Sequence, residues 1–246
     1  MGLLQLTKDP GKNTVGLPQL KDFILEHEME ESDLDKLLEI ISTGSDGAIL
    51  VLRGKEIPQV RILDKINLYL MLLKLDYSMA SADLLHWQDF EALVEYALEE
   101  HGFLTEKNYR FKDARGKRHE IDVLAIDKLS KEHLIFLLDA KHWNYKTNSS
   151  ATRILDAAKD QFKRTEALGK TKGALSQLFF KKNLEWSHAI LIPGVVTLLA
   201  PPVQDFFIPI VSILSFNNFI QEFSENLDYF KKKHVRGIPT QKRLVS

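Results

Sequence analysis

The stretch that decides the fold is HEIDVLAIDKLSKEHLIFLLDAK, which runs from His119 to Lys141. Two runs rich in Ile, Leu, Val and Phe flank a polar segment, and this arrangement predicts a β-hairpin. Centring the turn between residues 130 and 131 places Asp122 opposite Asp139 on the neighbouring strand. The hairpin therefore predicts two carboxylates side by side at the end of an apolar strand.

Two facing carboxylates need a physical reason, because like charges directly opposed on neighbouring strands destabilise a sheet. A shared divalent cation is the simplest reason, since Mg²⁺ is typically held by one or two carboxylates, waters and substrate phosphate. Lys141 follows Asp139 by two residues, so both side chains leave the same face of the strand. Such a lysine can orient or help deprotonate a water, or stabilise charge on a phosphate. The set predicts phosphodiester hydrolysis; the alternative is a plain ion pair between Lys141 and either aspartate.

The segments around this hairpin predict an α/β domain with a mixed sheet covered by helices on both faces. Apolar periodicity and turn residues place its helices and strands as follows: helices at 90–102, 151–168, 172–180 and 216–230, and strands at 109–112, 119–126, 133–141, 188–199 and 207–214. We expect three parts in the chain: a mainly helical N-terminal region (1–82), the α/β domain (83–230) and a basic C-terminal tail (231–246). Within the first part, residues 48–52 predict a strand, and Pro58 predicts the start of a helix to Leu75.

Composition excludes several classes of site. The chain of 246 residues has no cysteine, which excludes disulfides, thiolate catalysis and cysteine zinc sites. Its longest apolar run, 189–200, is too short to cross a bilayer, and its first residues are too polar for a secretory signal, so we expect a cytoplasmic protein with no membrane partner. The net charge is −1, yet segments 107–118 and 231–246 are strongly basic. They fit a polyanionic partner, or they are simply solvated surface.

The chain resembles the PD-(D/E)XK, or restriction-endonuclease-like, nuclease superfamily over roughly residues 86–225. The segments that carry the resemblance are DFEALVEYALEEHGF (89–103), EIDVLAID (120–127), LIFLLDAKHW (134–143) and ATRILDAAKDQFKR (151–164). It looks closest to the Mrr-type and archaeal Holliday-junction-resolvase branches. Two positions depart from the pattern: Ile121 stands where a proline would precede the first aspartate, and Thr165 stands where the RecB-like branch places a tyrosine.

The resemblance implies a set of site residues. The metal ligands would be Asp122, Asp139, the backbone carbonyl of Ala140 and Glu91, with Mg²⁺ as the cofactor and Mn²⁺ able to substitute. The catalytic set would be Glu91, Asp122, Asp139, Lys141 and Gln161. Glu91 has an ordinary alternative as an exposed acid, because its helix carries several others. Gln161 has either a catalytic or a structural role.

The same comparison implies a nucleic acid, most simply DNA, as the partner. The cations expected to contact it are Arg115, Lys117, Arg118, Lys146, Arg153, Lys163 and Arg164. The expected function is a metal-dependent endonuclease in restriction, repair or junction processing. RNA cleavage is not distinguished by the site chemistry. The alternative is a non-catalytic nucleic-acid-binding or assembly module that keeps the fold. Symmetric cleavage of two strands needs two sites, which fits a homodimer.

Overall fold

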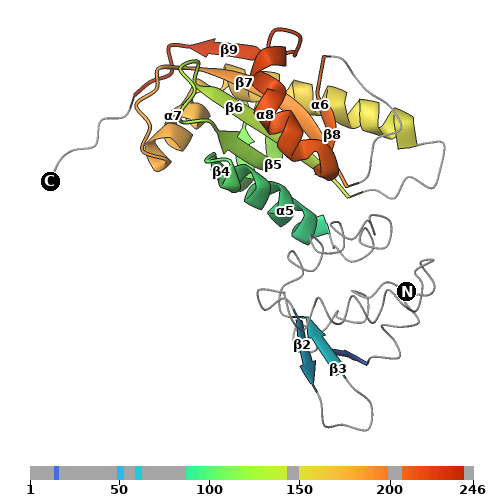
Figure 1. Cartoon of the computed structure of the whole chain (residues 1–246). Helices are drawn as coiled ribbons and strands as arrows, with labels where there is room; N and C mark the ends of the chain where they lie inside the picture. The colour runs from blue at the N-terminus through green and yellow to red at the C-terminus, as the bar shows by residue number, and fades with distance from the viewer. Residues whose placement is uncertain are drawn as a thin grey trace, which may run out of the picture. The chain divides into compact units, whose positions relative to one another are not determined.

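The computed structural model describes residues 14–16, 49–52, 59–62, 87–142, 150–198 and 207–240. Contacts divide the chain into two compact units, Met1–Asp89 and Phe90–Ser246. Up to residue 86, the described part of the first unit is a three-stranded antiparallel sheet in the order β1-β3-β2 (Figure 1). Its strands are β1 (Thr14–Gly16), β2 (Ile49–Leu52) and β3 (Gln59–Ile62).

This small sheet tests two expectations for the N-terminal region. Strand β2 lies where the apolar run at 48–52 predicts it. Strand β3 lies directly after Pro58, where we expect a helix, and that expectation is wrong for residues 59–62. Val60 and Ile62 are β-branched and alternate with polar residues, a pattern that favours a strand. The rest of the N-terminal region, which we expect to be mainly helical, lies outside the described residues.

The second unit holds a six-stranded mixed sheet in the order β4-β5-β6-β7-β8, with β9 paired to β7 (Figure 1). Strands β4, β5 and β6 are antiparallel to one another, and β6, β7 and β8 are parallel. In chain order the elements are α5 (Trp87–Glu100), β4 (Leu104–Lys112), β5 (Arg118–Ile126), β6 (Leu134–Lys141), α6 (Ser150–Lys170), α7 (Lys172–Lys181), β7 (His188–Thr197), β8 (Ile210–Ser212), a 3₁₀ turn (Ile213–Ser215), α8 (Phe216–Asn226) and β9 (Lys233–Arg236).

Helices cover both faces of this sheet, as the sequence predicts. Helices α6 and α7 pack on one face, where Leu168, Leu175 and Leu178 join a core with residues of β5 and β6. On the other face, Phe136 of β6 makes edge-to-face contacts with Phe103, at the end of α5, and with Phe223 of α8. Figure 1 shows α6 and α8 on opposite sides of the sheet. The mixed α/β architecture, with strands buried on both sides, is therefore confirmed.

The last strand was not expected. Residues 233–236, which we assign to a basic tail, form β9 and pair antiparallel with the first half of β7. Val235 and Ile238 are buried in the same core as α7, and the Ile238 amide donates to the carbonyl of Ser187. Hydrophobic patterning does not reveal this strand, because it begins in a run of three lysines (231–233) and Val235 is its one apolar residue. Among the described residues, no helix is long and apolar enough to cross a membrane.

Candidate active site

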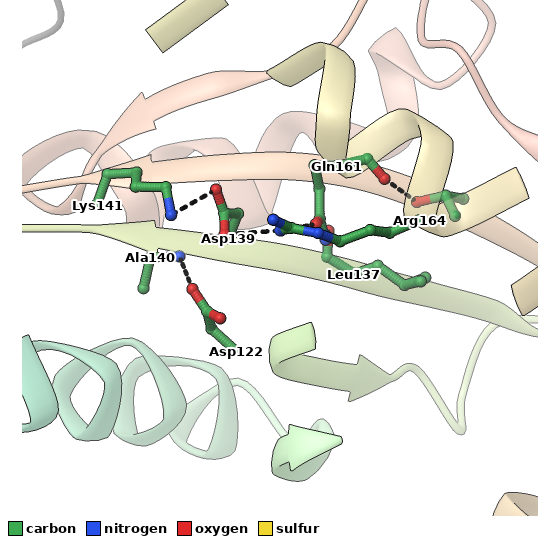
Figure 2. Close-up of polar contacts among 8 residues, drawn as sticks. Asp122, Leu137, Asp139, Ala140, Lys141, Gln161 and Arg164 are labelled. Carbon is green, nitrogen blue, oxygen red and sulfur yellow. Dashed lines mark hydrogen bonds and ion pairs between the residues drawn. The ribbon is translucent and has the colours of Figure 1, made fainter. Parts of the chain in front are cut away.

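The β5–β6 hairpin has the register that the turn position predicts, but its ladder stops at the acidic residues. Backbone pairing runs from Ile126 opposite Ile135 to Val123 opposite Leu138. Asp122 and Asp139 come next, and there the backbone pairing ends. The amide of Ala140 instead donates to Oδ2 of Asp122, at 2.9 Å (Figure 2). A carboxylate thus replaces a backbone carbonyl as the partner of β6.

Strand β4 is also irregular at this level. Asn108 stands where it would face Asp122, its φ is +51°, and the β4–β5 ladder skips that one pair. A positive φ is uncommon for a residue with a side chain, although asparagine tolerates it better than most. The pairs on either side of the gap keep one register, so no residue is inserted.

The alternation of side chains shifts by one residue across this irregular level. On β4, Leu104 packs toward the core under α7, and beyond Asn108 the residue that packs there is Tyr109, whose hydroxyl donates to the carbonyl of Ala174 in α7. On β5, Leu124 and Ile121 join that same core although they lie three positions apart. Regular strands would send residues three apart to opposite faces. On both strands the change of alternation therefore occurs at the level of Asp122.

Asp139 is almost fully buried, at 1% exposure, and is contacted by two cations. Nη1 of Arg164 donates to its Oδ1 at 3.0 Å, and Nζ of Lys141 lies 2.9 Å from its Oδ2. Figure 2 shows Lys141 on β6 and Arg164 on α6 reaching Asp139 from two sides. Within the described residues, Oδ2 accepts no hydrogen bond of good geometry despite its closeness to Lys141. The ion pair considered from sequence is thus present, and it leaves one buried oxygen incompletely satisfied.

The buried carboxyl of Asp122 lies within the electrostatic influence of Asp139. Burial, and then the neighbouring charge of Asp139, raise the pKa of Asp122 to about 7. The amide of Ala140 and the charge of Lys141 act in the opposite direction. A pair of carboxylates in which one resists ionisation is an arrangement that a divalent cation relieves.

Gln161 is fully buried, and both ends of its amide are used. Nε2 donates to the carbonyl of Leu137 on β6 at 2.8 Å, and Oε1 accepts from Nη1 of Arg164 at 3.0 Å. The side chain therefore links α6 to β6 at Leu137, which lies two residues before Asp139. This geometry favours a structural role in positioning Arg164 and Asp139.

Glu91 is not the exposed acid that its helix pattern allows. It is 8% exposed on α5, and burial, followed by the charge of Glu120, raises its pKa. Lys141 and Asp139 also act on it electrostatically, so it lies near the site. Among the described residues, however, no three acids or histidines stand close enough together to hold one ion. The structure thus brings Asp122, Asp139 and Lys141 together. Glu91 lies close enough to feel their charges but does not form a three-acid cluster with the two aspartates.

The cations expected to contact nucleic acid divide into groups. Arg115, Lys117 and Arg118 lie exposed in the β4–β5 turn and at the start of β5. Lys163 pairs with Asp160 on α6 at 2.8 Å. The hydrogen bond from Lys163 lowers the pKa of Asp160, and the charges of Arg164 and Lys117 lower it further. The β4–β5 turn and α6 thus bring three cations around one carboxylate.

The two remaining cations of that set contribute less to the described site. Arg153 is exposed near the start of α6. Lys146 lies outside the described residues.

Comparison with known proteins agrees with this geometry. A family model named Mrr_cat and described as restriction endonuclease matches residues 82–177. These residues form a restriction-endonuclease-like domain of the Mrr type. The match covers α5, the β4–β5–β6 meander, α6 and the first part of α7, and every candidate site residue falls within the matched range. No curated protein and no solved structure matched the chain.

The Mrr-type domain is thus a nuclease-class domain, and its donor set fits a divalent cation. Asp122 and Asp139 offer carboxylate oxygens, one of them buried without a good hydrogen bond, and oxygen donors are what Mg²⁺ prefers. The Ala140 carbonyl follows Asp139 directly on the same strand.

The sequence does not predict two features of the Mrr-type domain. It assigns Arg164 a contact with nucleic acid but does not predict its contact with Asp139, for which the only signal is its place three residues after Gln161 on the helix. Asn108 gave one weak signal, because asparagine is a turn-favouring residue in the middle of a strand.

Proposed function

We propose that the Mrr-type domain is a metal-dependent endonuclease that hydrolyses phosphodiester bonds in DNA. The observation that carries this proposal is the pairing of Asp122 and Asp139 where the β5–β6 ladder ends, with Lys141 beside them. Like charges at such a position destabilise a fold, so the arrangement is best explained by a ligand that needs both.

In this proposal, Asp122 and Asp139 hold the ion, with the Ala140 carbonyl as a further donor. A bound Mg²⁺ would lower the pKa of a water and neutralise charge on the phosphate, and Mn²⁺ could substitute for it. The Lys141 ammonium, now 2.9 Å from Asp139, would orient the attacking water or stabilise the charge that develops on the phosphate. Glu91 supports the site through its electrostatic coupling to Lys141 and Asp139.

Cations on the β4–β5 turn and on α6 suit the binding of a polyanion. Lys117, Lys163 and Arg164 all act electrostatically on Asp160, so three cations lie near one another beside the site. We extend the proposal to DNA as the partner, with the phosphate backbone lying across α6 and the tip of the β4–β5 hairpin. Cleavage of both strands of a duplex would need two copies of the site.

A cleavage screen tests the proposal. The full chain is incubated with plasmid, single-stranded, flap and four-way-junction DNA and with RNA, in Mg²⁺, Mn²⁺ or EDTA. We expect cutting of DNA in either metal, no cutting in EDTA, and loss of cutting in Asp139→Ala. Absence of metal-dependent cutting on every substrate, or undiminished cutting by Asp139→Ala, contradicts the proposal. Cutting of RNA alone would replace DNA as the substrate.

A second function, a nucleic-acid-binding module without catalysis, is favoured by two observations. Lys141 and Arg164 already neutralise Asp139, and three acids do not gather into one cluster among the described residues. Calorimetry with Mg²⁺ separates the two functions. An endonuclease shows metal binding that is lost in Asp122→Ala, whereas a binding-only module shows none in the wild-type protein.

A further inference from the structure

Arg164 is held at one end only. Nη1 makes two hydrogen bonds of 3.0 Å, one to Oδ1 of Asp139 and one to Oε1 of Gln161, and these use both of its N–H groups. Gln161 is itself tied to the carbonyl of Leu137 at 2.8 Å. Two buried acceptors therefore fix the position of the guanidinium against β6.

The opposite edge of the guanidinium is open. Within the part of the chain that the structure describes, Nε and Nη2 have no hydrogen-bond acceptor, and the side chain is 31% exposed. This edge carries parallel N–H groups in the planar fork that matches two oxygens of a phosphate. Because the other end is already anchored, little side-chain entropy would be lost on binding.

The electrostatic surroundings favour an anion at this edge. Besides Arg164 itself, Lys163 and Lys117 act on Asp160, so two further cations lie near this part of α6. Asp139 lies on the anchored side of the guanidinium, away from the open edge. A guanidinium needed only to neutralise Asp139 has no reason to keep its fork turned toward solvent, since Lys141 already contacts the same carboxylate.

We propose that Arg164 binds the DNA phosphate presented to Asp139, keeping Nη1 on the carboxylate and offering the Nε–Nη2 edge to two phosphate oxygens. This inference rests on the proposed function and deepens it. It makes Arg164 a link between the residue that would hold the ion and the group to be cleaved, where the sequence assigns it only a general contact with nucleic acid. A lysine at this position would supply the charge without the fork.

The test measures DNA binding without cleavage. The full chain is titrated into a short fluorescein-labelled DNA duplex in EDTA, and fluorescence anisotropy is followed at several KCl concentrations. We expect Arg164→Gln to weaken binding about tenfold and to reduce the slope of log affinity against log salt by about one, since one phosphate contact is lost. Arg164→Lys should keep the wild-type slope and lose about threefold in affinity, because the charge remains and the fork does not.

Lys159→Gln is the matched control. Lys159 lies on the same helix, is exposed and pairs with Asp156 at 3.2 Å. It lies five residues from Arg164, which is about 140° around the helix axis. The variant loses the same single charge, and we expect its affinity to stay within about twofold of the wild-type value.

The outcomes separate the two proposals. If the wild-type protein binds DNA and Arg164→Gln keeps both affinity and salt slope, the inference about Arg164 is wrong while the proposed function stands. Weaker binding with an unchanged slope shows that Arg164 only positions Asp139, and this also overturns the inference. If the wild-type protein binds no DNA, the proposed function itself fails and the inference with it. Circular dichroism checks folding, and if Arg164→Gln does not fold, unchanged affinity in Arg164→Lys contradicts the inference.

Discussion

The two ends of the β5–β6 hairpin differ in how their backbones pair and in what their side chains bury. Near the turn, Ile126 and Ile135 pair regularly and are fully buried. At the other end the ladder stops, a carboxylate accepts the Ala140 amide, and Asn108 on the next strand has a positive φ. Burial of apolar side chains is enough to explain the regular end. At the irregular end, two carboxylates lie close together, and this proximity lowers the stability of the fold. Stability and function should therefore respond separately to changes at the two ends.

The largest effect is expected from removing the cation at the irregular end. Lys141→Met should lower metal-dependent cleavage by about 100- to 1000-fold, the range seen when one stabilising group is lost from a transition state. Metal affinity should stay equal or rise, because Lys141 now competes for Oδ2 of Asp139. Single-turnover cleavage and Mn²⁺ calorimetry on one preparation measure both quantities. A parallel loss of metal binding would show that Lys141 instead maintains the shape of the site.

The regular end should give the opposite result. Ile135→Ala removes a side chain with no exposed surface, and we expect it to destabilise the domain by about 2–5 kcal/mol. Metal affinity per folded molecule should not change, because Ile135 lies four residues before Asp139 on β6. Urea unfolding gives the stability and calorimetry gives the affinity. Weaker metal binding in this variant would mean that the two ends are not independent.

Neutralising Asp122 should stabilise the metal-free protein. Since its folded pKa, about 7, lies above the ordinary value of 3.8, the unfolded chain loses this proton at lower pH than the folded protein. This group therefore lowers stability progressively as pH rises from about 4 to about 7, by an amount on the order of a few kcal/mol. Asp122→Asn should flatten that slope and raise the melting temperature at pH 8 in EDTA. An identical pH profile for variant and wild type would contradict the assignment.

The smallest effect is expected at Asn108, where a pair of variants isolates backbone geometry. Asn108→Val places a β-branched residue at a φ of +51° and should cost about 1–2 kcal/mol. Asn108→Gly, which permits the same φ, should stay within about 0.5 kcal/mol of the wild-type stability. Mn²⁺ affinity should fall only in the valine variant, because Asp122 loses its setting there. Equal effects in both variants would assign the role to the asparagine amide.

The same contrast explains which parts of the fold and the site can be predicted from the sequence. The hairpin register and the closeness of Asp122, Asp139 and Lys141 follow from turn position and strand alternation, which hold wherever backbone pairing is regular. The contact between Arg164 and Asp139 joins residues 25 positions apart. The apolar pattern of α6 predicts which face of the helix is buried but not how the helix is oriented against β6, and this orientation decides the contact. The shift at Asn108 breaks the alternation on which such analysis relies. The burial of Glu91 could not be foreseen, because its helix carries several other acids, most of them exposed or half-buried.

Strand β9 has a practical consequence for anyone who shortens this chain. It covers the His188–Leu191 half of β7, and Ser176 donates to the carbonyl of Pro239 just beyond it. Cutting the chain after residue 230, where the basic composition suggests a dispensable end, would bare a row of backbone donors and acceptors beside an apolar strand. Such an edge recruits other strands, so the shortened protein should self-associate before it unfolds. Lys233 and Arg236 of β9 thus give this edge of the sheet a charged border, which discourages pairing with further strands.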